Sequence, residues 1–174
     1  MTRPTKHPQA AIWLTVALLA STVASASAAT STARALRGRA PEIIAPTIEG
    51  KTFRLSALRG RVVVLDFLTP GCGECEIAAP LLERTAASLK NRRVSFVIVD
   101  LSGANPKQLR TYYRDELTLR HLTVIRDHKL EIARDYNAIT LGTTIIIGRN
   151  GQITWTGSWH DSTSTLLKAV TPTL

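Results

Sequence analysis

Two cysteines, Cys72 and Cys75, limit what this chain can fold into more than any other feature, because of the patterns on either side of them. An almost unbroken apolar run from Val62 to Leu68 precedes them and predicts a strand buried on both faces of a sheet. After them, apolar and small side chains recur at the spacing of one helix face: Ile77, Leu81, Leu82, Thr85, Ala86 and Leu89. The cysteines are therefore predicted where a central strand turns into a helix that ends near residues 90–91. Free N–H groups and the helix dipole at a helix start favour a thiolate on the first cysteine.

The spacing of the two cysteines is suited to thiol–disulfide exchange. Cys75 lies one helical turn after Cys72, close enough to close a small disulfide ring. In exchange, a thiolate attacks a disulfide sulfur and the resulting mixed disulfide is released by a second thiol. We assign Cys72 as the attacking thiol, because it precedes the helix, and Cys75 as the resolving thiol. Glu74 and Glu76 add negative charge that disfavours a thiolate, which favours a reductant over a strong oxidant.

Further motifs resemble the TlpA/ResA-like branch of the thioredoxin superfamily, which overlaps in sequence with the AhpC/TSA (peroxiredoxin) group. The matching segments are Gly-Arg-Ala-Pro at 38–41, the lead-in at 55–65, the hairpin at 143–151, and Pro80, five residues after the second cysteine. The resemblance covers roughly residues 36 to 170. It implies an α/β, thioredoxin-like fold with a mixed central sheet flanked by helices and an N-terminal β-hairpin extension. It also implies an extracytoplasmic thiol–disulfide oxidoreductase, for which no cofactor and no metal are expected.

Asp66 is a third candidate catalytic residue on the same resemblance. It lies six residues before Cys72, where thioredoxins keep a buried aspartate that assists proton transfer. We therefore expect Asp66 to accept a proton from Cys75. The alternative is a hydrogen-bonded polar residue at the end of a strand.

Two positions depart from the family pattern. Gly71 replaces the tryptophan that usually precedes the first cysteine, and Gly142 stands where a cis-proline should precede Thr143 and face the disulfide. We assign Gly142 and Thr143 to the substrate-facing loop. In one interpretation, Gly142 leaves this loop free to move and the thiols open to small molecules or metal ions. In the other, Gly142 only makes a tight turn into the following strand.

Other functions remain open at this point. The segment 69–72, Thr-Pro-Gly-Cys, also resembles the active site of a peroxiredoxin-like thiol peroxidase. That enzyme would need a proline at Leu65 and an arginine near Gly142. A copper-delivery protein of the Sco type would need Cys-x-x-x-Cys and a histidine near Gly142. A thioredoxin-fold accessory or metallochaperone-like binding protein, for example one resembling the methylamine dehydrogenase maturation protein, is the remaining alternative.

The N-terminus has the pattern of a targeting segment. Arg3 and Lys6 precede an apolar stretch at residues 10–20, and two Ala-x-Ala sites follow at 24–26 and 26–28. We predict that residues 1–28 form a signal peptide or an N-terminal membrane anchor, residues 29–37 a linker, and residues 38–174 the thioredoxin-like domain. Either form of the leader places the domain in the periplasm or on the outer face of the cytoplasmic membrane.

Composition narrows the remaining choices. The 174 residues are 44% apolar, enough for one core. The net charge of +9 comes from scattered lysines and arginines without interleaved aromatics, which argues against nucleic acid and leaves attraction to acidic partners or anionic lipid. Beyond the leader, His121, His128 and His160 are isolated and expected at the surface. The expected partners are protein thiols and disulfides and a membrane or periplasmic electron donor, with the protein acting as a monomer.

Sequence patterns also predict the remaining secondary structure. Two hairpins are expected: one within 41–55 that turns at Glu49-Gly50, and one of residues 143–147 and 152–156 joined through Asn150-Gly151. Further strands are expected at 94–101 and 122–125. Helices are expected from Asn105-Pro106 to about 116, at 129–136, and at the end of the chain to Val170, where Asp161 or Ser162 can cap the last helix. Strands that alternate with helices and close with a hairpin predict an α/β domain with a mixed sheet.

Overall fold

The computed structural model describes residues 38–158 and 163–173 of the chain. The predicted leader and linker, His160 and the two candidate helix caps Asp161 and Ser162 lie outside the described residues. Within them, no helix is both long enough and apolar enough to cross a bilayer.

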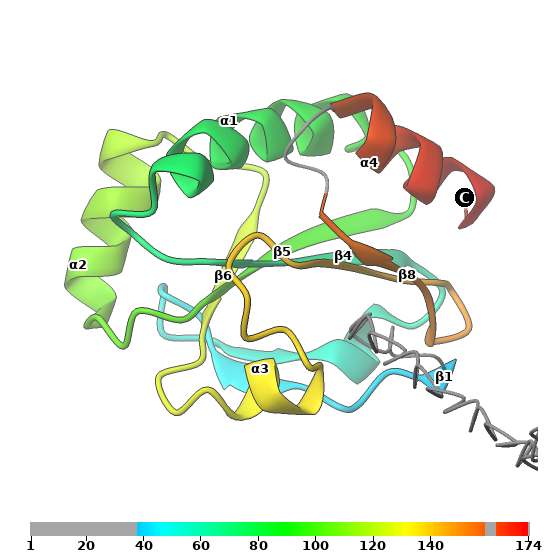
Figure 1. Cartoon of the computed structure of the whole chain (residues 1–174), viewed down its shortest axis with the longest axis horizontal. Helices are drawn as coiled ribbons and strands as arrows, with labels where there is room; N and C mark the ends of the chain where they lie inside the picture. Colours follow the sequence, from blue (N-terminus) through cyan, green and yellow to red (C-terminus); the bar gives the residue numbers. More distant parts are fainter. Residues whose placement is uncertain (1–37, 159–162, 174) are drawn as a thin grey trace, which may run out of the picture. The chain divides into compact units, whose positions relative to one another are not determined.

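A six-stranded mixed sheet forms the centre of the domain (Figure 1). Its order is β1-β8-β7-β4-β5-β6, with β1 at Gly38–Arg39, β8 at Gln152–Gly157, β7 at Thr144–Ile147, β4 at Val62–Leu68, β5 at Val94–Asp100 and β6 at Thr123–Arg126. Strand β4 pairs in parallel with β5 and antiparallel with β7. The predicted mixed sheet is therefore confirmed.

The central strand β4 has all seven of its residues buried, as its apolar sequence predicts. Because successive side chains of a strand point to opposite faces, the strand contributes to two cores. Val62, Val64 and Leu68 belong to the cluster that includes α1 (Gly73–Ser88), whereas Val63, Leu65 and Phe67 belong to the cluster on the other face. Asp66 lies two residues from both Val64 and Leu68, so its side chain points to the same face as theirs, the face that α1 covers.

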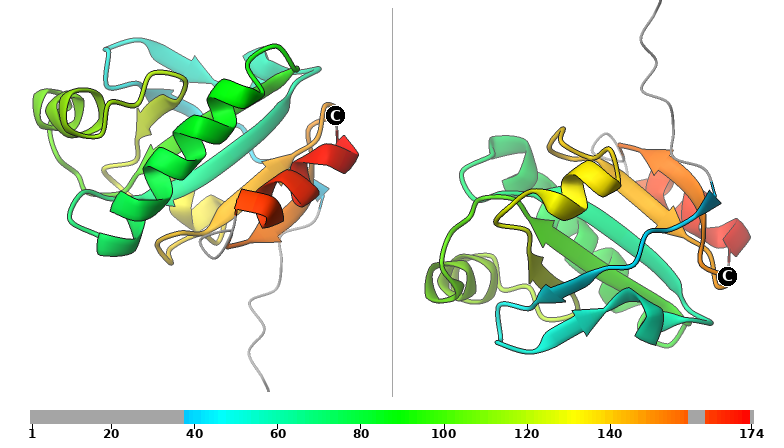
Figure 2. Two further views of the ribbon diagram at one scale, coloured as in Figure 1. Left: turned by 90° about the horizontal axis from the view of Figure 1, so that it is seen from above. Right: turned by 90° about the horizontal axis from the view of Figure 1, so that it is seen from below.

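Helices and a small hairpin cover the two faces of the sheet (Figures 1 and 2). Helices α1 and α4 (Thr163–Val170) lie side by side on one face. On the other face lie α3 (Glu131–Asp135) and the predicted hairpin, formed by β2 (Ile44–Pro46) and β3 (Thr52–Arg54) and followed by the short 3-10 helix η1 (Leu55–Leu58). This hairpin turns at Thr47–Gly50, where the Gly50 N–H donates to the Thr47 carbonyl (3.0 Å).

The predicted helix after Asn105 forms in two parts. Asn105 caps α2 (Pro106–Arg110) through a capping box with Gln108, as its Asn-Pro start predicts. From Thr111 to Glu116 the chain continues with π-helical hydrogen bonding as η2. A π segment adds one residue to a helical turn, which no local propensity in the sequence indicates. It places Tyr112 and Tyr113 beside the cysteine helix.

Candidate active site

The end of β4 and the start of α1 together position the cysteines. Strand β4 ends at Leu68, four residues later Cys72 is the N-cap of α1, and its Sγ accepts a hydrogen bond from the Cys75 N–H (3.3 Å). The two cysteines form a disulfide, with a Cα–Cα distance of 5.1 Å. Cys75 is 2% exposed, whereas Cys72 is only half-buried. Cys72 is therefore the more exposed of the two cysteines, as the order of the motif predicts.

The loop just before Cys72 is open to solvent. Gly71 is exposed, has a φ of +77°, and a methyl group added there would meet nothing within 4 Å. Glycine thus stands here in place of the tryptophan usual in the family, and no other described side chain fills the space beside it. On the inner side of the loop lies Tyr112, which the sequence analysis did not single out. Burial raises the pKa of Tyr112, with nearby Glu76 and Glu116 adding to the rise, while the backbone N–H of Gly71 acts in the opposite direction.

Asp66 is completely buried in β4, on the face that α1 covers. Ile98 of β5 and Thr144 of β7 are its neighbours across the sheet. Its negative charge contributes to raising the pKa of Tyr113, so the carboxyl group lies within electrostatic reach of the tyrosine that packs beside α1. The structure therefore brings Asp66 to the buried side of the cysteine helix, and its proton-accepting role remains a proposal.

A second buried carboxyl group, Asp100, lies at the end of β5 and was missed by the sequence analysis. Its side chain accepts hydrogen bonds from the Tyr113 hydroxyl (2.8 Å), the Ser102 hydroxyl (2.6 Å) and the Ser102 N–H (3.1 Å). Burial raises the pKa of Asp100 above its ordinary value of 3.8, and the hydrogen bonds partly oppose the rise. Burial and Asp100 together raise the pKa of Tyr113 well above its ordinary value of 10. Asp100 thus fixes Tyr113, and with it η2, against the α1 face of the sheet.

The raised pKa of Asp100 predicts a specific dependence of stability on pH. A carboxyl group whose pKa is higher in the folded state favours folding below its unfolded pKa, and this contribution is lost as the pH rises through the folded pKa. Relative to Asp100→Asn, which does not titrate, the unaltered protein should therefore lose on the order of 1 kcal/mol of unfolding free energy between pH 4 and pH 7. Urea unfolding of both proteins across this range measures the difference. Parallel curves would contradict the assignment.

The segment before β7 forms a tight turn at Gly142. The Thr143 N–H donates to the Thr140 carbonyl (3.2 Å), and the φ of Gly142 is +78°, which is the geometry of a type II turn. The Gly142 N–H donates to the Phe67 carbonyl (2.9 Å), and the Phe67 N–H donates to the Thr143 carbonyl (3.0 Å). Gly142 therefore makes a tight turn into β7, and the turn is hydrogen-bonded to β4. The role of Gly142 and Thr143 toward substrates remains a proposal.

An apolar cavity of about 250 Å³ adjoins the turn and the loop that carries Cys72. Its walls come from four separate segments and comprise Thr69, Leu101, Leu130, Ala133, Ile139 and Leu141. Leu130, Ile139 and Leu141 are 39%, 68% and 41% exposed, which is high for large apolar side chains. The cavity therefore presents an open apolar surface three residues before Cys72.

The described histidines lie at the surface. His128 is exposed. His121 is also at the surface, as predicted, but it is not isolated: its Nδ1 is 2.6 Å from Oε1 of Glu83, which also accepts the N–H groups of Arg120 and His121. In the described part of the chain, no three His, Cys, Asp or Glu residues are grouped so that they could hold a metal ion.

Comparison with known proteins identifies the family. The sequence model of the AhpC/TSA family matches residues 36–156, and the chain belongs to this family. It is 29% identical to the thiol-disulfide oxidoreductase ResA of Geobacillus kaustophilus over 70% of this chain and 68% of the relative. It is 27% identical to the sporulation thiol-disulfide oxidoreductase A of Bacillus subtilis, over 62% of this chain and 64% of the relative.

Solved structures show the same fold. A protein assigned as the thiol:disulfide interchange protein DsbE of Chlorobium tepidum has a TM-score of 0.70 at 25% identity, covering 79% of this chain and 97% of that one. A secreted Mycobacterium tuberculosis disulfide oxidoreductase has a TM-score of 0.64 at 23% identity, covering 75% and 95%. The fold, the Cys72–Cys75 disulfide and these relatives together show a thiol–disulfide oxidoreductase with a thioredoxin-like fold.

Proposed function

We propose that this protein is an exported oxidoreductase that exchanges its Cys72–Cys75 pair with the thiols and disulfides of other proteins. The observation that carries the proposal is the disulfide at the start of α1, in which Cys72 is accessible and Cys75 is buried. Cys72 and Cys75 are the catalytic cysteines, and Asp66 assists proton transfer from below the helix.

In the reducing direction, the steps follow from this arrangement. The Cys72 thiolate attacks one sulfur of a substrate disulfide, which breaks that S–S bond and releases one substrate thiolate, and this thiolate takes a proton from water. Cys75 then loses its proton to Asp66 and attacks the Cys72 sulfur, which releases the second substrate thiolate, and Asp66 passes its proton to this second thiolate. The substrate has gained two electrons and two protons, and the protein is left with the Cys72–Cys75 disulfide. A thiol donor must reduce this disulfide before the next cycle.

The charges at the helix start support a reducing direction of electron flow. Glu74 and Glu76 are exposed in the first turn of α1, where negative charge opposes the dipole that stabilises a thiolate. We expect a reduction potential near that of thioredoxin, about −270 mV, rather than near the −120 mV of a strong oxidant. Equilibration with glutathione or dithiothreitol buffers measures it. In the same assay, Glu74→Gln/Glu76→Gln should shift the potential upward by at most about 30 mV, and a potential near −120 mV for the unaltered protein would contradict the reductant role.

The apolar cavity supports a preference for substrates with an apolar side chain near the reacting cysteine. We expect Leu141→Ser to raise the KM for a protein disulfide such as insulin about fivefold, because it removes part of an apolar surface, and to leave the reaction with oxidised glutathione unchanged. Leu167→Ser is the matched control, because Leu167 of α4 is 37% exposed and Leu141 is 41% exposed. Equal effects of the two variants, or an equal loss with glutathione, would exclude a substrate role for the cavity.

Export is the part of the proposal that concerns residues 1–37. It is supported by the basic start, the apolar stretch and the two Ala-x-Ala sites, and one structural relative is a secreted protein. We propose that residues 1–28 direct export as a signal peptide or membrane anchor and that residues 29–37 link them to the domain at 38–174. Mass spectrometry of the protein from an exporting host should find a new N-terminus near residue 27 or 29, or an intact chain in the membrane fraction. Recovery from the cytoplasm would contradict export.

In that compartment, the protein needs a source of electrons. We propose that a membrane or periplasmic donor reduces the Cys72–Cys75 disulfide and that the protein acts as a monomer. Light scattering of the purified protein tests the second point, since a stable dimer would contradict it.

A further inference from the structure

The end of the sheet opposite the disulfide carries a group of exposed cations. Strands β4 and β5 begin at this end, while β7 and α1 finish there. The group consists of Arg59 before β4, Lys90 after α1, Arg92 and Arg93 before β5, and Arg149 after β7, and all five are exposed. We call these five residues the basic end. Seven residues of β4 separate it from the loop of Cys72, a distance of about 20 Å.

The five cations of the basic end do not take part in the two ion pairs found between described residues, Arg114 with Glu49 and His121 with Glu83. The disulfide end, by contrast, carries exposed side chains of both signs: Glu74 and Glu76 in the first turn of α1, and Lys107 and Lys129 after β5 and β6. Exposed positive charge is therefore concentrated at the basic end.

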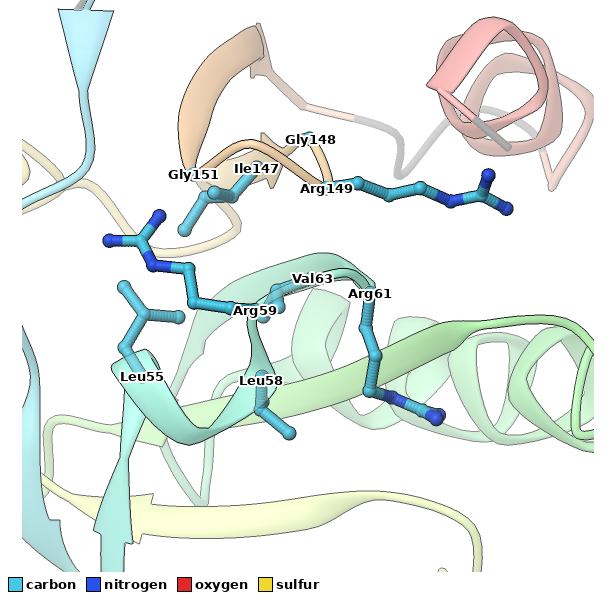
Figure 3. A pocket seen from close by; sticks show the side chains of 9 residues that line it. All are labelled: Leu55, Leu58, Arg59, Arg61, Val63, Ile147, Gly148, Arg149 and Gly151. Carbon is cyan, nitrogen blue, oxygen red and sulfur yellow. The ribbon is translucent and has the colours of Figure 1, made fainter.

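The shape of the basic end indicates what kind of anion it fits. A cavity lies between Arg59, Arg61 and Arg149, but its volume of about 10 Å³ has room for about one water molecule. Figure 3 shows the three guanidinium groups pointing away from one another. The Arg59 guanidinium donates a hydrogen bond to the Asn150 carbonyl (3.3 Å), and the Arg61 guanidinium donates to the Ser95 hydroxyl and the Val94 carbonyl. Diverging cations cannot enclose one small anion, but they suit an extended anionic surface.

The described domain also begins at this end. Strand β1 pairs with the start of β8, Gly38 with Ile153 and Arg39 with Gln152, directly after the turn that carries Arg149. In Figure 1, β1 and the β7–β8 turn lie on the right, whereas the passage from β4 into α1 lies on the left. The first described residue, Gly38, therefore lies beside the start of β8, close to the basic end.

We propose that the basic end binds the anionic phospholipid headgroups of a bilayer and holds the domain with its disulfide facing away from the membrane. Basic residues near an anionic membrane contribute to binding additively, and the disulfide end, where Lys107 and Lys129 accompany Glu74 and Glu76, offers no comparable attraction. The proposal rests on the proposed export of the chain and is independent of the thiol chemistry. Nucleic acid is the less suitable partner, because no aromatic side chains are interleaved with these cations to stack on bases.

Vesicle binding tests the proposal with the chain as it is recovered from an exporting host. Its binding is measured to vesicles of phosphatidylcholine alone and of phosphatidylcholine with phosphatidylglycerol. The ratio of the two affinities isolates the charge-dependent part, because any contribution of residues 1–28 to binding neutral lipid is present in both. We expect a ratio well above one that falls by at least about tenfold in Arg92→Glu/Arg93→Glu.

The matched control is Lys107→Glu/Lys129→Glu, which changes the net charge equally. Both lysines are exposed and follow the ends of β5 and β6, on the disulfide side. This control should change the ratio less than about twofold. An equal fall in both variants, or a ratio near one for the unaltered chain, would overturn the proposal. If the ratio is near one and the unaltered chain instead binds DNA, and Arg92→Glu/Arg93→Glu abolishes that binding, the partner is nucleic acid and the lipid proposal is overturned. Insulin reduction by both variants should remain unchanged, so a failure of the proposed chemistry would be seen separately.

Discussion

Replacing Cys72 by serine should abolish insulin reduction, with a loss on the order of 10³-fold or more, whereas Cys75→Ser should trap substrates as mixed disulfides. The difference follows from position. Cys72 is the half-buried N-cap of α1, at the helix start that favours its thiolate, and Cys75 is 2% exposed. Without Cys75 the first attack still occurs, but no internal thiol resolves the intermediate. Turnover measures the first effect, and non-reducing electrophoresis with mass spectrometry measures the second.

Two outcomes would contradict this assignment of roles. One is that both variants trap partners equally, or that neither does. The other is steady reduction of hydrogen peroxide that survives the loss of Cys75, which would favour the peroxidase alternative. Ser102→Ala serves as a control for general damage, because Ser102 is exposed and its hydroxyl bonds to Asp100 rather than to the cysteines. It should retain both turnover and resolution.

Gly142→Pro should strongly destabilise the protein, although a proline is the family's usual residue at this position. Proline fixes φ near −65° and has no N–H, whereas Gly142 has a φ of +78° and donates its N–H to the Phe67 carbonyl. We therefore expect the free energy of unfolding in urea to fall by about 3 kcal/mol or more.

Gly142→Ala separates the two causes of that loss. Alanine keeps the N–H and suffers only from the positive φ, so it should cost about 1–2 kcal/mol. If Gly142→Pro unfolds at the same urea concentration as the unaltered protein, the loop can rebuild at no cost and the turn is not a fixed part of the site.

The elements that the sequence predicted well are those whose pattern is complete within a short segment. Three such patterns predict their structure from neighbouring residues alone, and all three are confirmed: the apolar run of β4, the helical spacing of α1 and the Asn-Pro start of α2. Asn150-Gly151 likewise marked the hairpin of β7 and β8. Gly151 has the expected positive φ of +79°, and its N–H donates to the Gly148 carbonyl. Local turn chemistry was sufficient there.

What the sequence analysis missed depends on contacts between distant segments. Strand β1 has only two residues and exists because it pairs with β8, more than a hundred residues later. The hydrogen bond from Tyr113 to Asp100 requires the π-helical segment η2, which no propensity indicates. The turn at Gly142 was left undecided, because the bond that fixes it goes to Phe67 on another strand. Such contacts are fixed by packing and not by neighbouring residues.

The most direct test of the proposed chemistry is a single-turnover exchange between the reduced protein and a substrate protein with one disulfide. Quenching the reaction with acid and identifying the products by mass spectrometry gives the state of every cysteine. We predict that one substrate disulfide opens for each Cys72–Cys75 disulfide formed, through an intermediate that is linked to the substrate at Cys72. An unreacted Cys72–Cys75 dithiol, or an intermediate linked at Cys75, would contradict the account.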